Sequence, residues 1–162
     1  MEEKFTELLY ENQGIVHKIS NLYFGDRLEK EDYYQELIIQ LWKAFPSFNS
    51  TSKFSTWMYR VCINSAIDIK RKEKHRLNQV ELTEVNIQNL SHEEESTHIN
   101  KEKLYEAING LSDVNKAIIT LHLDEYSYQE IAEMIGISKS NAGVKINRIK
   151  SQILKLLEHG NS

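Results

Sequence analysis

Apolar residues recur at intervals of three and four along several stretches of the chain, with polar residues between them. Such spacing places the apolar side chains on one face of an α-helix. The first stretch covers residues 1–24, and the second covers residues 30–44 and stops before Pro46, which lacks an amide donor. The apolar face of the second stretch comprises Tyr33, Tyr34, Leu37, Ile38, Leu41 and Trp42. We expect both helices to pack through these faces.

The second helix begins with polar and acidic residues, among them Glu31, Asp32, Gln35 and Glu36. Acidic residues in a first turn suit the helix dipole, which would explain them without any partner. A docking surface for a basic partner is the functional alternative.

Residues 54–76 form a third helical stretch, FSTWMYRVCINSAIDIKRKEKHR. At about 100° per residue, one arc of about 80° holds Arg60, Asn64, Asp68 and Arg71, with Trp57 one turn before them. A second arc, typical of a core, holds Phe54, Met58, Val61, Cys62 and Ile69. A ring, an amide and cations together are suited to holding unstacked bases and phosphates, so we predict a nucleic-acid-facing helix. An ordinary amphipathic helix with a solvated basic end is the alternative.

A short polar loop, SFNSTSK, connects the second and third helices. Beside Trp57, its hydroxyl and amide groups could form a pocket that reads the edge of an extruded base, although such loops are also plain connectors.

Periodicity is lost over residues 73–100, which are rich in Glu, Asn, Gln, Ser and His. We interpret residues 76–100 as a flexible linker between two small domains, residues 1–75 and 101–162. His92, His98 and the acidic residues 93–95 lack a structured ligand spacing, so the linker is favoured over a metal site.

Helical periodicity returns from residue 101, with two short helices and a cap at Ser112 or Asp113. The following segment has an S-x-x-E capping box at Ser127 and Glu130, a turn at Gly136 and a second cap at Ser138. This spacing is typical of a DNA-binding helix-turn-helix; a helical hairpin for protein contact is the alternative.

The second helix of this motif is expected to face DNA. Cationic side chains can contact phosphates or guanine edges, Asn147 can pair with adenine, and Val144 can touch a thymine methyl. Gly143 costs about 1 kcal/mol relative to alanine inside a helix, which either a close approach to DNA or simple indifference would explain. The outward-facing residues are Ser140, Asn141, Gly143, Val144, Lys145, Asn147, Arg148 and Lys150.

Charge is unevenly distributed in this chain of 162 residues. The net charge is −4, yet residues 51–78 carry 7 Lys/Arg against 2 Asp/Glu, which suits contact with nucleic acid through a limited face. No apolar run approaches a membrane span and no signal peptide opens the chain, so we expect a cytoplasmic protein. The single cysteine, Cys62, suits a buried thiol. The sequence assembles no catalytic set, metal site or cofactor loop, so we expect neither an enzyme nor a small-molecule substrate.

Two blocks resemble the bacterial RNA polymerase sigma factors, and the compact two-domain form resembles their extracytoplasmic function (ECF) group. The first block is EDYYQELIIQLWKAFPSFNSTSKFSTWMYRVCINSAIDIKRK, and the second is LSDVNKAIITLHLDEYSYQEIAEMIGISKSNAGVKINRIK. The resemblance implies an all-α fold of two helical domains joined by a flexible linker. It also implies core RNA polymerase, through its β′ clamp coiled coil and β subunit, and promoter DNA as partners, and it allows an anti-sigma factor.

The resemblance further assigns three sets of residues. Core polymerase would be bound by Asp32, Gln35, Glu36 and Trp42. The −10 element would be bound by Asn49, Ser50, Thr51, Ser52, Lys53, Trp57, Arg60, Asn64, Lys70 and Arg71. The −35 element would be bound by the outward face of the last helix. The recognition helix departs from the commoner pattern by Gly143-Val144-Lys145, and Glu125 replaces a usual glycine, which leaves the −35 sequence open. A stand-alone helix-turn-helix regulator and a pure protein-interaction module are the competing interpretations.

Overall fold

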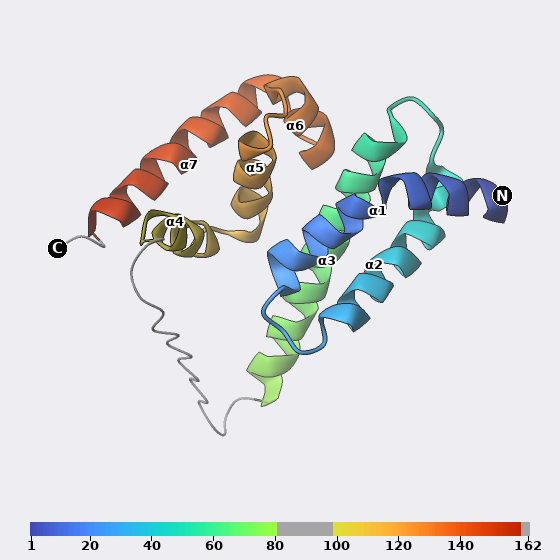
Figure 1. Ribbon diagram of the computed structural model, residues 1–162, viewed down its shortest axis with the longest axis horizontal. Helices are drawn as coiled ribbons and strands as arrows, with labels where there is room; N and C mark the ends of the chain where they lie inside the picture. Colours follow the sequence, from blue (N-terminus) through green and yellow to red (C-terminus); the bar gives the residue numbers. More distant parts are fainter. Residues whose placement is uncertain (81–98, 160–162) are drawn as a thin grey trace.

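The computed structural model describes residues 1–80 and 99–159, and within these ranges the regular secondary structure is helical, with no strand. Figure 1 shows two groups of helices, one on each side of the molecule. The first group is α1 (Glu2–Phe24), α2 (Lys30–Ala44), the short 3-10 turn η1 (Phe45–Ser47) and α3 (Phe54–Val80). The second is α4 (Ile99–Asn109), α5 (Asp113–Leu123), α6 (Tyr128–Ile135) and α7 (Lys139–His159). The predicted all-α, two-domain fold is confirmed.

Local capping signals explain the start of α5 and both ends of α6. The Ser112 hydroxyl accepts from the Asn115 amide and begins α5. Ser127 and Glu130 form the predicted reciprocal capping box of α6, and Gly136 ends α6 in the left-handed region at φ 89°. Because side-chain caps replace missing backbone partners, these boundaries follow from nearby residues alone.

Helix α3 continues to Val80, beyond the point where the sequence pattern lost its periodicity. The prediction of an aperiodic segment from residue 73 is therefore wrong for residues 73–80. Residues 74–78 are all exposed, so no apolar face marks this part of the helix. Residues 81–98, with most of the expected linker and the histidines considered as metal ligands, lie outside the described residues.

The two groups of helices pack against each other mainly through α3, and α1 also contacts α5. Helices α1, α2 and α3 contact one another pairwise, and α3 also contacts α5 and α6 of the second group. The buried apolar side chains form one connected cluster that runs through both groups, from Phe5 to Ile153. The relative orientation that the sequence left open is thus a closed one, in which α3 lies between α1 and α2 on one side and α5 and α6 on another.

Candidate nucleic-acid and protein-binding surfaces

The four residues expected to bind polymerase lie on α2 and share one side of it. At about 100° per residue, they fall within roughly 120° of one another. Asp32 and Gln35 are exposed, Glu36 is half-buried, and the Trp42 ring packs on Phe5 with 5.1 Å between ring centroids. The acidic residues thus lie on the same side of α2 as a partly exposed indole.

Ile39 lies near the middle of this same arc, although the sequence pattern did not mark it as a candidate. It is 44% exposed, close to the 42% of Trp42. An exposed apolar pair among acidic side chains is typical of a protein-binding face rather than of a solvated one. The seven-residue spacing from Asp32 to Ile39 could have indicated this, because residues seven apart lie on almost the same face of a helix.

The loop of residues 49–53 is exposed throughout. The Asn49 side-chain oxygen accepts from the Thr51 amide at 3.2 Å and from the Thr51 hydroxyl at 2.8 Å. Ser50 has φ 62°, a left-handed conformation that a short polar residue tolerates better than a branched one. Asn49 therefore shapes the loop, and the hydroxyls of Ser50, Ser52 and the ammonium of Lys53 lie at the surface around it.

Trp57 is half-buried at the edge of an aromatic cluster beside this loop. Its ring lies 5.3 Å from those of Phe48 and Phe54 and 6.3 Å from that of Phe45. These contacts are in the range of offset and edge-to-face ring pairs, which hold the indole in a fixed orientation. The indole is therefore both a structural side chain and a candidate stacking platform.

The polar arc of α3 is present, and Lys70, which the resemblance assigned to the −10 element, lies outside it. Arg60, Asn64 and Arg71 are exposed, and Arg71 lies 3.6 Å from Asp68 on the same helix. Lys70 precedes Arg71 by one residue and so points about 100° away from it. Its ammonium donates to Asp113 of α5 at 2.9 Å. The structure thus separates Lys70 from the other −10 candidates.

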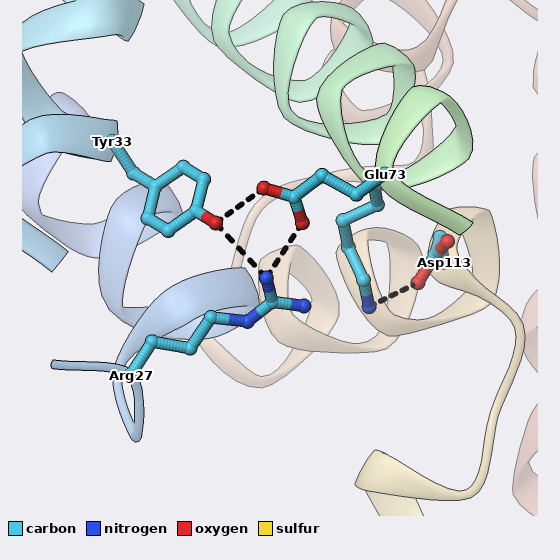
Figure 2. Close-up of polar contacts among 5 residues, drawn as sticks. Arg27, Tyr33, Glu73 and Asp113 are labelled. Carbon is cyan, nitrogen blue, oxygen red and sulfur yellow. Dashed lines mark hydrogen bonds and ion pairs between the residues drawn. The ribbon is translucent and has the colours of Figure 1, made fainter. Parts of the chain in front are cut away.

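A polar clasp of Arg27, Tyr33 and Glu73 joins the turn between α1 and α2 to α2 and α3, and the sequence pattern did not predict it. Figure 2 shows Arg27 donating to the Tyr33 hydroxyl at 3.0 Å and to Glu73 at 2.6 Å, while the Tyr33 hydroxyl also donates to Glu73. The Phe24 and Tyr33 rings stack at 4.0 Å, and the guanidinium lies over both. Burial raises the pKa of Tyr33, and its hydrogen bond to Glu73 raises it further. Partners 40 and 46 residues apart give no periodic signal.

The helix-turn-helix in α6 and α7 has the predicted geometry. Ala132 is buried where the helices approach, and the inward residues Ala142, Ile146, Ile149 and Ile153 are buried. The Ser138 hydroxyl accepts from the Asn141 amide at 3.1 Å at the start of α7. This interaction fixes the turn through side chains close in sequence.

The exposed face of α7 divides the −35 candidates into a centre and two flanks. Ser140, Asn141, Val144, Asn147 and Arg148 are exposed and fall within roughly 120° of one another. Gly143, Lys145 and Lys150 lie about 100° or more from Val144, toward the edges. A recognition helix reads base edges with its centre, so the flanking lysines suit phosphates.

Packing within the chain does not require a glycine at position 143. A Cβ there would lie 3.5 Å from two ring atoms of Tyr128, an ordinary contact distance.

Cys62 is fully buried, and burial raises the pKa of its thiol to about 12. The thiol stays protonated at neutral pH, which agrees with the expected buried cysteine and makes it a poor nucleophile. Among residues 1–80 and 99–159, no group of three His, Cys, Asp or Glu side chains could hold a metal ion. None of the described helices is sufficiently long and apolar to traverse a membrane.

These features describe a helical protein of two groups of helices, the second of which contains a helix-turn-helix. The family model of Sigma-70 region 2 matches residues 8–76, and that of Sigma-70, region 4 matches residues 101–153. The chain belongs to the sigma-70 family of RNA polymerase sigma factors. Its relatives identify it further as a member of the ECF group.

Among those relatives is the ECF RNA polymerase sigma factor SigW of Bacillus subtilis (strain 168), which is 29% identical over 96% of this chain and 84% of its own length. The RNA polymerase sigma factor SigS of Staphylococcus aureus (strain NCTC 8325 / PS 47) is 26% identical, with 96% and 97% covered. A stand-alone regulator is not favoured, because it would leave the region 2 match without a role.

Two solved structures share the fold over both domains. The sigma factor RpoE of Bartonella quintana, in complex with the anti-sigma factor NepR, has a TM-score of 0.70 at 18% identity, covering 96% of this chain and 98% of that one. CnrH, in complex with the cytosolic domain of CnrY, has a TM-score of 0.64 at 16% identity, covering 98% and 90%.

Proposed function

We propose that this sigma factor divides its work among three surfaces of named residues. Helix α2 docks on core RNA polymerase through Asp32, Gln35, Glu36 and Trp42, with Ile39 added to that set. The exposed arc of α3 and the loop of residues 49–53 bind the non-template strand of the −10 element. The centre of α7 reads the −35 element.

The observation that carries this assignment is the position of the loop beside Trp57. Three phenylalanine rings fix the indole next to a loop of exposed hydroxyl and amide groups. A base that leaves the duplex can stack on such a ring while the loop hydrogen-bonds its edge. Because only an unpaired base gains these contacts, binding favours the melted promoter.

The phosphates of the same strand would be neutralised by cations of α3. Arg60 and Arg71 lie on the arc that begins at Trp57, and Lys70 lies on the neighbouring side of the helix. The protein thus supplies specificity and strand separation, while bond formation belongs to the polymerase. Protein inhibitors of the anti-sigma class are a further proposed partner, since the structural neighbour RpoE was solved with the anti-sigma factor NepR.

The test is titration of the protein into sigma-free bacterial core polymerase, followed by run-off transcription on pooled promoter-sized fragments. Initiation from a small subset of fragments with a shared motif is expected, and it would also supply the promoter sequence. Folded protein that forms no stable complex with core from a matching bacterium would overturn the proposal.

The contribution of the α7 surface is tested by a pair of matched variants in the same run-off assay. Arg148→Ala, at the centre of the exposed face of α7, should reduce initiation from the selected promoters. Lys155→Ala, an equally exposed cation farther along α7, should leave it unchanged. Equal effects of the two substitutions would remove the centre of α7 from the interface.

A further inference from the structure

A surface cavity of about 480 Å³ lies at the boundary between α3 and α5. Its walls come from three places in the chain, which are the turn between α1 and α2, one side of α3, and the first residue of α5. Figure 2 shows one lining residue from each of them, namely Arg27, Glu73 and Asp113. The cavity is therefore formed by the fold and not by one helix alone.

The α3 wall of the cavity is mostly one face of that helix. Ile67, Lys70, Arg71, Lys74 and Leu77 all line it, and at about 100° per residue they fall within about 120° of one another. Three cations thus follow one another along the wall, with an aliphatic side chain before them and another after them.

Positive charge exceeds negative charge among the lining residues. Four of them are cations, since Arg27 joins the three of α3, and two are carboxylates, Glu73 and Asp113. Lys70 donates to Asp113 at 2.9 Å, and Arg27 donates to Glu73 at 2.6 Å. Lys74 takes part in none of the ion pairs found within residues 1–80 and 99–159. Its charge is left for another anion.

A further cation lies near the same cavity. Lys116 of α5 is buried, and its pKa is lowered by that burial and then by the positive charge of Lys70. Asp113 and Asp26 oppose this shift without cancelling it. Two ammonium groups therefore share the neighbourhood of the Asp113 carboxylate, and a bound anion would stabilise both.

The donors at the cavity suit a phosphate group. Arg27 makes both of its hydrogen bonds through Nη1, so a guanidinium with five N–H groups keeps donors for another acceptor. Lysine ammoniums bind phosphate as point charges. The cavity volume falls within the roughly 300–1,000 Å³ of small-molecule sites, so a phosphate that carries an organic group also fits.

We propose that this cavity binds a phosphorylated small molecule of the size of a nucleotide. Its phosphate oxygens accept from Arg27, Lys70 and Lys74, and the aliphatic ends of the α3 wall contact its organic part. Arg71 is not counted, because it lies 3.6 Å from Asp68 on its own helix. The inference goes beyond the proposed function, in which neither Arg27 nor Lys74 has a role.

The two carboxylates at the cavity do not prevent this binding. The side chains of the Lys70–Asp113 pair are 21% and 33% exposed, and those of the Arg27–Glu73 pair are 37% and 27% exposed. Partly hydrated ion pairs contribute at most about fivefold each to an equilibrium constant. A phosphate with up to about two negative charges can therefore compete with either carboxylate.

The test titrates ADP into the isotope-labelled full-length protein in metal-free buffer and follows the backbone amide signals by NMR. Adenosine is the matched ligand, because it lacks only the phosphates. ADP should shift the signals of residues around the cavity, and adenosine should not. ADP at about ten times its dissociation constant should also raise the melting midpoint, because a ligand of the folded chain stabilises it.

Two lysine variants locate the site. Lys74→Gln should weaken ADP binding about fivefold, the most that one exposed cation contributes, and Lys74→Arg should retain it. Lys72→Gln is the control, since Lys72 is equally exposed on α3 and points about 160° away from Lys74. Circular dichroism checks that each variant is folded.

The backbone of a promoter strand carries the same phosphate chemistry, so a short oligothymidine is titrated in parallel. A loss of affinity for oligothymidine alone in Lys74→Gln would overturn the proposal and assign the cavity to the strand. Absence of ADP binding, equal binding of adenosine, or equal losses in Lys74→Gln and Lys72→Gln would also overturn it. The titration uses no polymerase or promoter, so its failure is distinct from failure of the run-off assay that tests the proposed function.

Discussion

Replacement of Gly143 by alanine tests why a glycine lies inside the recognition helix. Its backbone is helical, and the added Cβ would meet the Tyr128 ring at 3.5 Å without a clash. Alanine is favoured over glycine inside a helix by about 0.5–1 kcal/mol, so Gly143→Ala should stabilise the protein by that amount. For a domain of about 60 residues, such as residues 101–162, the melting midpoint should rise by roughly 2–8 °C.

The assay is thermal unfolding followed by circular dichroism, paired with binding of the holoenzyme to promoter DNA. Gly14→Ala is the matched control, since a Cβ on Gly14 of α1 would have no side chain within 4 Å and would lie away from α7. Both substitutions should raise the melting midpoint of the protein. A lower midpoint for Gly143→Ala alone would refute the argument from available space. A higher midpoint with weaker promoter binding would show that the glycine permits close approach to DNA.

Three further predictions concern docking, melting and pH. Trp57→Ala should impair promoter opening, read by permanganate footprinting, more than core binding; equal losses would contradict the division of labour. Asp32→Lys with Glu36→Lys should weaken core binding at least about tenfold, whereas Glu2→Lys with Glu3→Lys should not; unchanged affinity would remove the pair from the interface. Because the Cys62 pKa rises from 9.0 to about 12 on folding, the unfolded chain loses the thiol proton first. Stability should therefore fall above pH 9 by up to about 1.4 kcal/mol per pH unit from this group, and Cys62→Ala should remove that part of the slope in denaturant titrations.

Features set by neighbouring residues could be predicted from the sequence. The bounds of α2 agree with the apolar stripe and Pro46. The start of α5 agrees with its serine cap, and the two ends of α6 agree with its serine cap and Gly136. Each depends on residues within about one helical turn, where spacing determines geometry. The end of α3 could not be found in this way, because exposed residues carry no buried face to detect.

Contacts between distant residues could not be predicted. Lys70 and Arg71 were assigned one role because they are adjacent in the resembling motif, yet a helix directs them about 100° apart. The partner of Lys70, Asp113, follows it by 43 residues, and the sequence indicated Asp113 only as a cap candidate. Ile63 is buried, and Ile67 lines a surface cavity together with Lys70 and Asp113, so the side of α3 near α5 also includes apolar residues.

The clasp of Arg27, Tyr33 and Glu73 has a mechanical consequence for the proposed function. It ties the start of the docking helix to α3 beyond the −10 arc, and the apolar core joins the same helices along their length. Because α2 and α3 would move together, a movement of the polymerase clamp would shift the bound strand by nearly the same amount. The protein would behave as a rigid spacer, so the distance from the clamp to the first unpaired base becomes a fixed property of the chain.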